Sequence, residues 1–153
     1  MKIDGLLQQE DIIPCLATET KDQVLLELAA KVEERHPLLK REKVYQVLQE
    51  RERLGSTGIG DGIAIPHGKF KHAKDLILVF GRSSKGVDFN ALDGRKVHIF
   101  FLLLAPEEAF GLHLKMLGRI SRILKDPEVR KGLLDAPDAM AIHGIIQEQD
   151  NRY

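Results

Sequence analysis

A histidine at position 67 is the residue of this chain that is best placed to do chemistry. It follows an apolar run at positions 63–65 and then Pro66, whose ring fixes the backbone that enters the histidine. Strand ends of this kind are common locations for sites in α/β sheets. Because a neutral imidazole nitrogen attacks phosphorus and passes the group onward, we predict that His67 accepts a phosphoryl group. A histidine that only caps a strand end through hydrogen bonds is the structural alternative.

The glycine-rich segment around His67 predicts a loop whose backbone amides approach an anion closely. Two known phosphate loops do not fit it. The Walker pattern needs four residues between its first glycine and its Gly-Lys pair, whereas Gly62 and Gly68 enclose five. The dinucleotide fingerprint fails because Ile63 and Ile65 stand where its third glycine belongs. The predicted ligand is phosphate. The spacing equally allows a flexible surface loop, and a nucleotide-binding protein with an unusual glycine loop is a third interpretation.

A phosphoryl group needs cations and hydrogen-bond donors, and arginine supplies a planar fork for its oxygens. Arg51 and Arg53 stand at the end of an amphipathic segment over 41–53, from which either could reach His67. His113 opens a second apolar stripe and could orient the first imidazole or donate to the phosphoryl group. The alternatives are a solvated arginine and a histidine that caps its helix.

Composition excludes several classes of function. Lys plus Arg and Asp plus Glu both number 23, so no net field attracts nucleic acid or an anionic membrane. The apolar run at 99–105 falls far short of the roughly 20 residues that span a bilayer. The N-terminus lacks a secretory signal and Cys15 is alone, so we expect a protein of the reducing cytoplasm. The remaining histidines have no zinc spacing, and we expect no metal site.

Hydrophobic periodicity predicts a single α/β domain over residues 1–153. Thr20 and Gln23 resemble a capping box for a helix that ends near Pro37. Further helices are expected at 41–53, 113–124, 128–134 and 138–146, and strands at 11–16, 63–65, 76–80, 97–104 and about 87–89. In the helix after His113 the expected apolar stripe contains Leu114, Leu117, Ile120 and Leu124. Core positions are predicted for Phe100, Phe101 and Phe110, and Cys15 is expected to behave as a small hydrophobic residue.

The segment GSTGIGDGIAIPHGK at 55–69 resembles the phosphorylation-site signature of enzyme IIA domains of the fructose, mannitol and nitrogen-regulatory class. The preceding RERL and the HLKML at 113–117 support the resemblance, which covers nearly the whole chain. It implies that His67 is the phospho-acceptor, His113 the second active-site histidine and Arg51 the arginine that steadies the phosphoryl group. It further implies a phosphoryl-binding loop that includes Ser56, Thr57 and Gly68. The implied fold is a mixed sheet of about four to five strands with helices on both faces.

The same resemblance implies partners rather than cofactors. The donor would be a histidine phosphocarrier protein, itself charged through a phosphoenolpyruvate-dependent enzyme, and neither metal nor organic cofactor would be needed. The residues of the signature are most similar to those of the stand-alone nitrogen-regulatory type, whose targets include potassium transporters and sensor kinases. The alternative is a IIA component that passes phosphate to the IIB domain of a sugar permease. Asp61 stands where asparagine is usual, and its charge would either slow acceptance or point to solvent.

Overall fold

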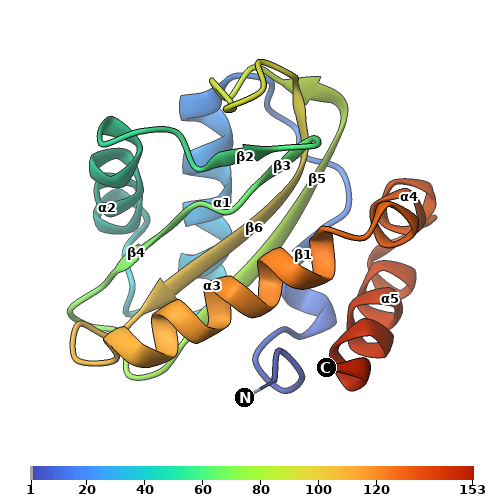
Figure 1. Cartoon of the computed structure of the whole chain (residues 1–153). Coiled ribbons are helices and arrows are strands. Elements are labelled where there is room, and N and C mark those ends of the chain that lie inside the picture. The colour runs from blue at the N-terminus through green and yellow to red at the C-terminus, as the bar shows by residue number, and fades with distance from the viewer. Residues whose placement is uncertain (1) are drawn as a thin grey trace.

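The computed structural model describes residues 2–153 and folds them into one mixed sheet of six strands between two layers of helices (Figure 1). The α/β class and the helices on both faces are therefore confirmed. Two short strands within the glycine-rich segment raise the strand number above the expected four to five, whereas the separate strand expected at about 87–89 is instead the end of one long strand, Ile77–Val87. In chain order the elements are a 3-10 turn (Gln9–Asp11), β1 (Ile12–Ile13), α1 (Lys21–Arg35), α2 (Arg41–Arg53), β2 (Gly58–Gly60), β3 (Ile63–Ala64), β4 (His67–Lys69), β5 (Ile77–Val87), β6 (Val97–Ala105), α3 (Phe110–Leu124), α4 (Pro127–Asp135) and α5 (Ala139–Arg152).

Strand β6 is the centre of the sheet, whose order is β1-β5-β6-β3-β2. It pairs antiparallel with β5 and parallel with both β3 and β4, which follow one another along its other side. Pro66 separates β3 from β4, yet its carbonyl still accepts a hydrogen bond from the Leu103 amide at 2.9 Å. The segment that ends in His67 is thus anchored to the most central strand.

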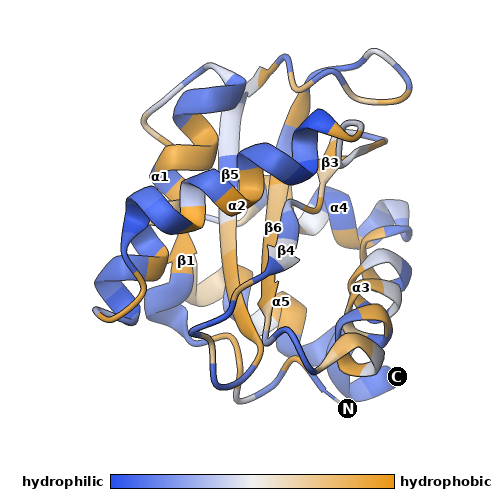
Figure 2. Cartoon of the chain, turned by 90° about the vertical axis from the view of Figure 1, so that its left-hand side faces the viewer, coloured by the Kyte–Doolittle hydropathy of each residue, from blue (hydrophilic) through white to orange (hydrophobic). Residues whose placement is uncertain are grey.

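The side chains of β6 alternate between two cores, because successive residues of a strand point to opposite faces. Phe101 and Leu103 pack with residues of α3, α4 and α5, whereas Phe100 and Leu102 pack with residues of α1 and α2. Figure 2 shows that β5 and β6 are apolar along most of their length, while the helices carry apolar and polar sides. The predicted core positions of Phe100 and Phe101 are confirmed, and both side chains are fully buried.

Three helices begin at side chains that cap them. The Thr20 hydroxyl accepts from the Gln23 amide at 3.3 Å, and the carboxylates of Asp126 and Asp138 do the same for α4 and α5. The predicted start of the first helix is confirmed, and the helix ends at Arg35, just before Pro37. The last helix runs to Arg152, beyond the expected end at 146.

Three apolar residues do not lie where the sequence predicts. Phe110 and Leu114 are each 54% exposed, and Cys15 is exposed beyond the last paired residue of β1. Helix α3 buries a face that runs through His113 and Met116, and Leu114 lies about 100° around the helix from His113. The predicted stripe is therefore one residue out of phase at its start. This displacement buries a histidine in place of a leucine.

One buried carboxylate joins the two ends of the chain. Asp150 of α5 accepts hydrogen bonds from the amides of Ile3 at 3.1 Å and Asp4 at 2.8 Å. Its other partner is Arg119 of α3, whose Nε lies 2.5 Å away. The two termini accordingly lie close to each other beside α5 (Figure 1).

Candidate active site

His67 is the first residue of β4 and points toward α3. It stands opposite Leu103 in the parallel ladder, and paired residues share one face of a sheet. Leu103 belongs to the core on the α3 side, so the imidazole lies on that side as well. The alternation of the strand then turns Gly68 toward α2.

The hydrogen bonds of His67 indicate which ring nitrogen carries the proton and which the lone pair. Nδ1 lies 2.7 Å from the carbonyl oxygen of Ile65, which only accepts, so Nδ1 carries the proton. Nε2 accepts a hydrogen bond from Nε of Arg51 at 3.3 Å, so this nitrogen carries the lone pair. His67 is therefore a neutral imidazole whose Nε2 lone pair is met by the Arg51 guanidinium.

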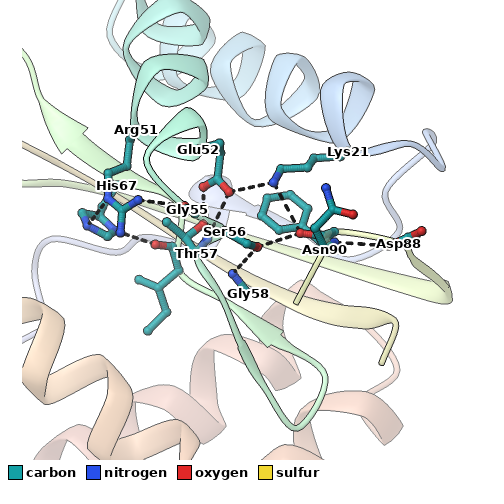
Figure 3. A network of polar contacts seen from close by, with 12 residues as sticks. Lys21, Arg51, Glu52, Gly55, Ser56, Thr57, Gly58, His67, Asp88 and Asn90 are labelled. Carbon is teal, nitrogen blue, oxygen red and sulfur yellow. Dashed lines mark hydrogen bonds and ion pairs between the residues drawn. The ribbon is translucent and has the colours of Figure 1, made fainter. Parts of the chain in front are cut away.

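Arg51 lies in the last turn of α2 and connects the histidine to the glycine-rich loop (Figure 3). Its Nη1 donates to the carbonyl oxygen of Gly55 at 2.8 Å while its Nε donates to His67. Two contacts of one planar group fix the orientation of the guanidinium. The structure thus brings Arg51 to the histidine, whereas Arg53 is exposed.

His113 completes a group of three nitrogen side chains. Its ring centroid lies 5.3 Å from that of His67, with the two planes at 78°. The residue is 7% exposed, and within residues 2–153 its Nε2 finds no hydrogen-bond partner. A buried polar atom without a partner costs about 1–3 kcal/mol, so Nε2 of His113 is a candidate to hydrogen-bond a group that binds beside His67.

Burial keeps both imidazoles neutral. It lowers the pKa of His67, and the charge of Arg51 lowers it further, against the raising effects of the Ile65 carbonyl and Glu52. Burial is also the main cause that lowers the pKa of His113, with His67 and Lys69 adding to it. Two neutral rings at pH 7 keep the lone pair on Nε2 of His67 unprotonated and let an incoming anion meet the guanidinium of Arg51.

The expected phosphoryl-binding hydroxyls are engaged elsewhere. Ser56 donates to the carbonyl oxygen of Phe89 at 2.7 Å, and the Thr57 hydroxyl is hydrogen-bonded to the carboxylate of Glu52. Thr57 is also buried. In the structure both hydroxyls hydrogen-bond to groups other than His67.

Gly68 and Asp61 have structural explanations. A Cβ at position 68 would lie 2.5 Å from Cγ1 of Val47, so only glycine lets α2 pack this closely on β4. Asp61 occupies the exposed turn between β2 and β3 with φ of 57°, and its amide donates to the Asp93 carboxylate at 2.9 Å. Of the two interpretations of Asp61, its exposure favours the one in which the carboxylate meets solvent.

Glu52 is a residue near the site that the sequence interpretation did not find. It follows Arg51 and its side chain is only 6% exposed. Nothing in the pattern of a charged helix end indicates a buried carboxylate, because its partners come from α1 and from the loop after α2. Across the described residues, no group of three or more His, Cys, Asp or Glu side chains could hold a metal ion. For the same part of the chain, none of the helices combines the length and apolarity needed to cross a bilayer.

A three-layer α/β domain that gathers two neutral histidines and an arginine at a sheet edge suits the handling of phosphoryl groups on histidine. The chain belongs to the EIIA 2 family of the phosphoenolpyruvate-dependent sugar phosphotransferase system, whose model matches residues 5–149. It is thus an EIIA-type domain.

The relatives include both regulatory and sugar-specific proteins. A nitrogen regulatory protein of Bradyrhizobium diazoefficiens is 43% identical over 146 residues, which are 95% of either chain. The fructose-specific EIIABC component of Bacillus subtilis is 38% identical over 150 residues, 98% of this chain but only 24% of that longer protein. The crystal structure of nitrogen regulatory protein IIA-Ntr from Neisseria meningitidis superposes with a TM-score of 0.87 at 33% identity, covering 92% of this chain and 96% of that one.

Proposed function

We propose that the chain accepts a phosphoryl group on Nε2 of His67 from the phosphohistidine of a histidine phosphocarrier protein. The observation that carries the proposal is the neutral imidazole whose Nε2 faces Arg51 while Nδ1 is held by the Ile65 carbonyl. A histidine that only caps a strand would not need its second nitrogen turned to an arginine. The family supports the phosphoryl chemistry.

In the proposed step the lone pair of Nε2 forms a bond to phosphorus while the bond from phosphorus to the donor imidazole breaks. The electron pair of that bond leaves on the donor nitrogen, and no other reactant is consumed. Arg51 first gives up its hydrogen bond to Nε2 and then contacts the phosphoryl oxygens, where negative charge develops. His113 supplies its unpartnered Nε2 to the same group.

We propose further that the phosphorylated histidine acts mainly as a regulatory signal in the cytoplasm. The regulatory relatives, matched over nearly their full length, support this interpretation. The targets would be transporters or sensor kinases that distinguish the charged from the uncharged form, because a phosphoryl group adds about −1.5 to −2 charge to the surface they meet.

A second candidate function is transfer to the IIB domain of a sugar permease. The 38% identity to a fructose-specific EIIABC component favours it. The two functions share the acceptance step and differ in where the phosphoryl group goes next. Incubation of the phosphorylated chain with a purified IIB domain separates them, because only a transport component returns to the unphosphorylated form at a useful rate.

Labelling tests the acceptance step. The chain is incubated with phosphoenolpyruvate and the two upstream proteins, and acid-labile, base-stable phosphate is measured. We expect stoichiometric labelling that disappears in His67→Ala and persists in His72→Ala, a matched change of an exposed histidine. Undiminished labelling of His67→Ala would overturn the proposal.

A further inference from the structure

Glu52 is a buried carboxylate next to Arg51 in the chain, and no step of the proposed transfer uses it. It accepts the Thr57 amide at 3.0 Å and the Thr57 hydroxyl, and it pairs with Nζ of Lys21 at 3.0 Å. A charge is buried at this depth only when partners of this kind satisfy it. The carboxylate therefore binds three partners that come from two separate parts of the chain.

Neither charge of this pair stands where its own helix favours it. Glu52 lies in the last turn of α2, where the helix dipole disfavours an anion, and Lys21 is the first residue of α1, where it disfavours a cation. Lys21 also donates to the Phe89 carbonyl at 3.4 Å and lies 4.7 Å from the centre of the Phe89 ring. The position of the Glu52–Lys21 pair is therefore determined by its contacts with Thr57 and Phe89, not by the two helix dipoles.

Those contacts fix the turn that connects α2 to β2 (Figure 3). Glu52 holds Thr57, while the Ser56 hydroxyl donates to the Phe89 carbonyl at 2.7 Å and accepts the Gly58 amide at 3.0 Å. The carbonyl oxygen of Gly55 at the start of this turn receives Nη1 of Arg51 at 2.8 Å. Gly55 itself has φ of 143°, a conformation that glycine adopts easily and other residues do not, so the contacts of the residues that follow decide where its carbonyl lies.

We propose that Glu52 is a positioning residue whose carboxylate, paired with Lys21, holds the turn at 55–57 so that the Gly55 carbonyl keeps the guanidinium of Arg51 against Nε2 of His67. The inference rests on the proposed function for its meaning, because Arg51 is there the group that meets the phosphoryl oxygens. The path runs from Lys21 through Glu52 and the turn to Arg51 and His67, and Glu52 touches neither reacting atom.

A direct effect of charge and a positioning effect shift the pKa of His67 in opposite directions. The negative charge of Glu52 raises this pKa and the positive charge of Arg51 lowers it more strongly. If Glu52 acts only by its charge, Glu52→Gln lowers the pKa of His67. If it positions Arg51, the same change releases the arginine and the pKa rises toward that of Arg51→Ala. His113 faces the ring from α3 in every variant and leaves the comparison unaffected.

The experiment measures the pKa of His67 by NMR titration of the unphosphorylated protein, together with the rate of phosphoryl transfer. The variants are Glu52→Gln, Arg51→Ala, the double variant, and Thr57→Val, which removes one hydroxyl contact of the carboxylate. Glu50→Gln is the matched control, because Glu50 is an exposed carboxylate on the same helix. All are first checked for native spectra, and Thr57→Val carries the test should Glu52→Gln not fold.

We expect Glu52→Gln to raise the pKa of His67 and to slow transfer about tenfold, since a small misplacement of a positioning group has effects of this order or larger. In the Arg51→Ala background the same change should lower the pKa, and Glu50→Gln should stay within about twofold of the wild type. A lowered pKa in the single variant, or an unchanged rate, would overturn the proposal. A wild-type chain that accepts no phosphate would instead refute the proposed function, and the titration would still decide the role of Glu52.

Discussion

The reactivity that we propose for His67 would come from how its two ring nitrogens are occupied. A backbone carbonyl holds Nδ1 at 2.7 Å, and Arg51 occupies Nε2 at 3.3 Å. The arginine that would stabilise the phosphoryl group therefore also covers the nucleophile until a donor arrives. Such an arrangement protects a neutral lone pair and places the cation one short movement from where charge develops.

The lowered pKa values of His67 and His113 predict how the protein responds to acid. Both groups stay neutral in the folded chain to a lower pH than a free histidine, whose pKa is about 6.5. Transfer should therefore keep its rate as pH falls somewhat below 6.5.

The same lowered pKa values make folding stability depend on pH. The unfolded chain binds more protons below about pH 6.5, so folding stability should decrease as pH falls from about 6.5 through the folded pKa values. Urea unfolding of the wild type and His67→Gln between pH 8 and 5 checks the sign, and a wild type that gains stability toward pH 5 would contradict it.

Removal of the Arg51 side chain should slow phosphoryl transfer by roughly a hundredfold, the order seen when one preorganised donor is lost. Arg51→Lys should recover part of the rate, because an ammonium keeps the charge but not the planar fork. The measurement is single-turnover transfer from the phosphorylated donor. Arg53→Ala is the control, since that arginine lies two residues further on and is exposed; equal losses in the two alanine variants would argue against a specific role for Arg51.

The elements place these groups by simple alternation. Strand β4 turns His67 toward α3 and Gly68 toward α2, so one three-residue strand faces a helix on each side of the sheet. The helix that carries Arg51 lies directly against the glycine. The distance between the arginine and the histidine is therefore set by how closely α2 packs on β4.

Gly68→Ala tests that packing. The new methyl group would lie 2.5 Å from Cγ1 of Val47, and overpacking of this kind costs typically 1–3 kcal/mol. We expect both a lower free energy of unfolding and slower transfer, because α2 must move away with Arg51. Val47→Ala in the same chain should restore part of both quantities.

Gly118→Ala is the matched control for that experiment, because nothing lies within 4 Å of the added atom in α3. Alanine in a helix interior is favoured over glycine by roughly 0.5–1 kcal/mol, so this variant should be slightly more stable. Gly68→Ala behaving in the same way would show that the contact with Val47 yields easily.

The sequence predicts these elements unevenly. Long periodic segments such as α1, α2 and β6 are found because their apolar spacing is repeated many times, and His67, the proposed acceptor, stands out because proline and glycines flank it. The short strands β2 and β4 carry no periodic signal. Strand β2 pairs with β3, over three residues with an irregular register, and β4 pairs with β6, more than thirty positions away. Ser56 and Thr57 are predicted to bind the phosphoryl group from the resemblance alone, and their hydroxyl partners Phe89 and Glu52 could not be foreseen from local sequence.

The chain as a whole is closed by contacts between its two ends. Asp150 lies fully buried between the N-terminal amides and Arg119, and α5 lies across the sheet face that also carries α3. Burial raises the pKa of Asp150. The hydrogen bonds from Asp4 and Ile3 and the contact with Arg119 together lower this pKa by more than burial raises it, so the net shift is downward. This carboxylate thus contributes stability that is lost as pH falls through its folded pKa.

Asp150→Ala should destabilise the fold by about 3–5 kcal/mol, since it leaves Arg119 and two amides without their buried partner. The measurement is the free energy of unfolding from urea titration at pH 7. Glu148→Ala is the control, because Glu148 forms an exposed pair with Arg152 and should change stability by less than about 1 kcal/mol. Similar values for both variants would mean that the ends of the chain are not held through Asp150.

The position of the phosphoryl group on the protein decides the central claim. Long-range proton–nitrogen NMR of the chain phosphorylated by its donor, with ¹⁵N-labelled histidine, reports which ring nitrogen carries phosphorus. We predict a phosphoryl group on Nε2 of His67, with Nδ1 still protonated and bound to the Ile65 carbonyl. Phosphorus on Nδ1 of His67, or on any other histidine, would contradict the account.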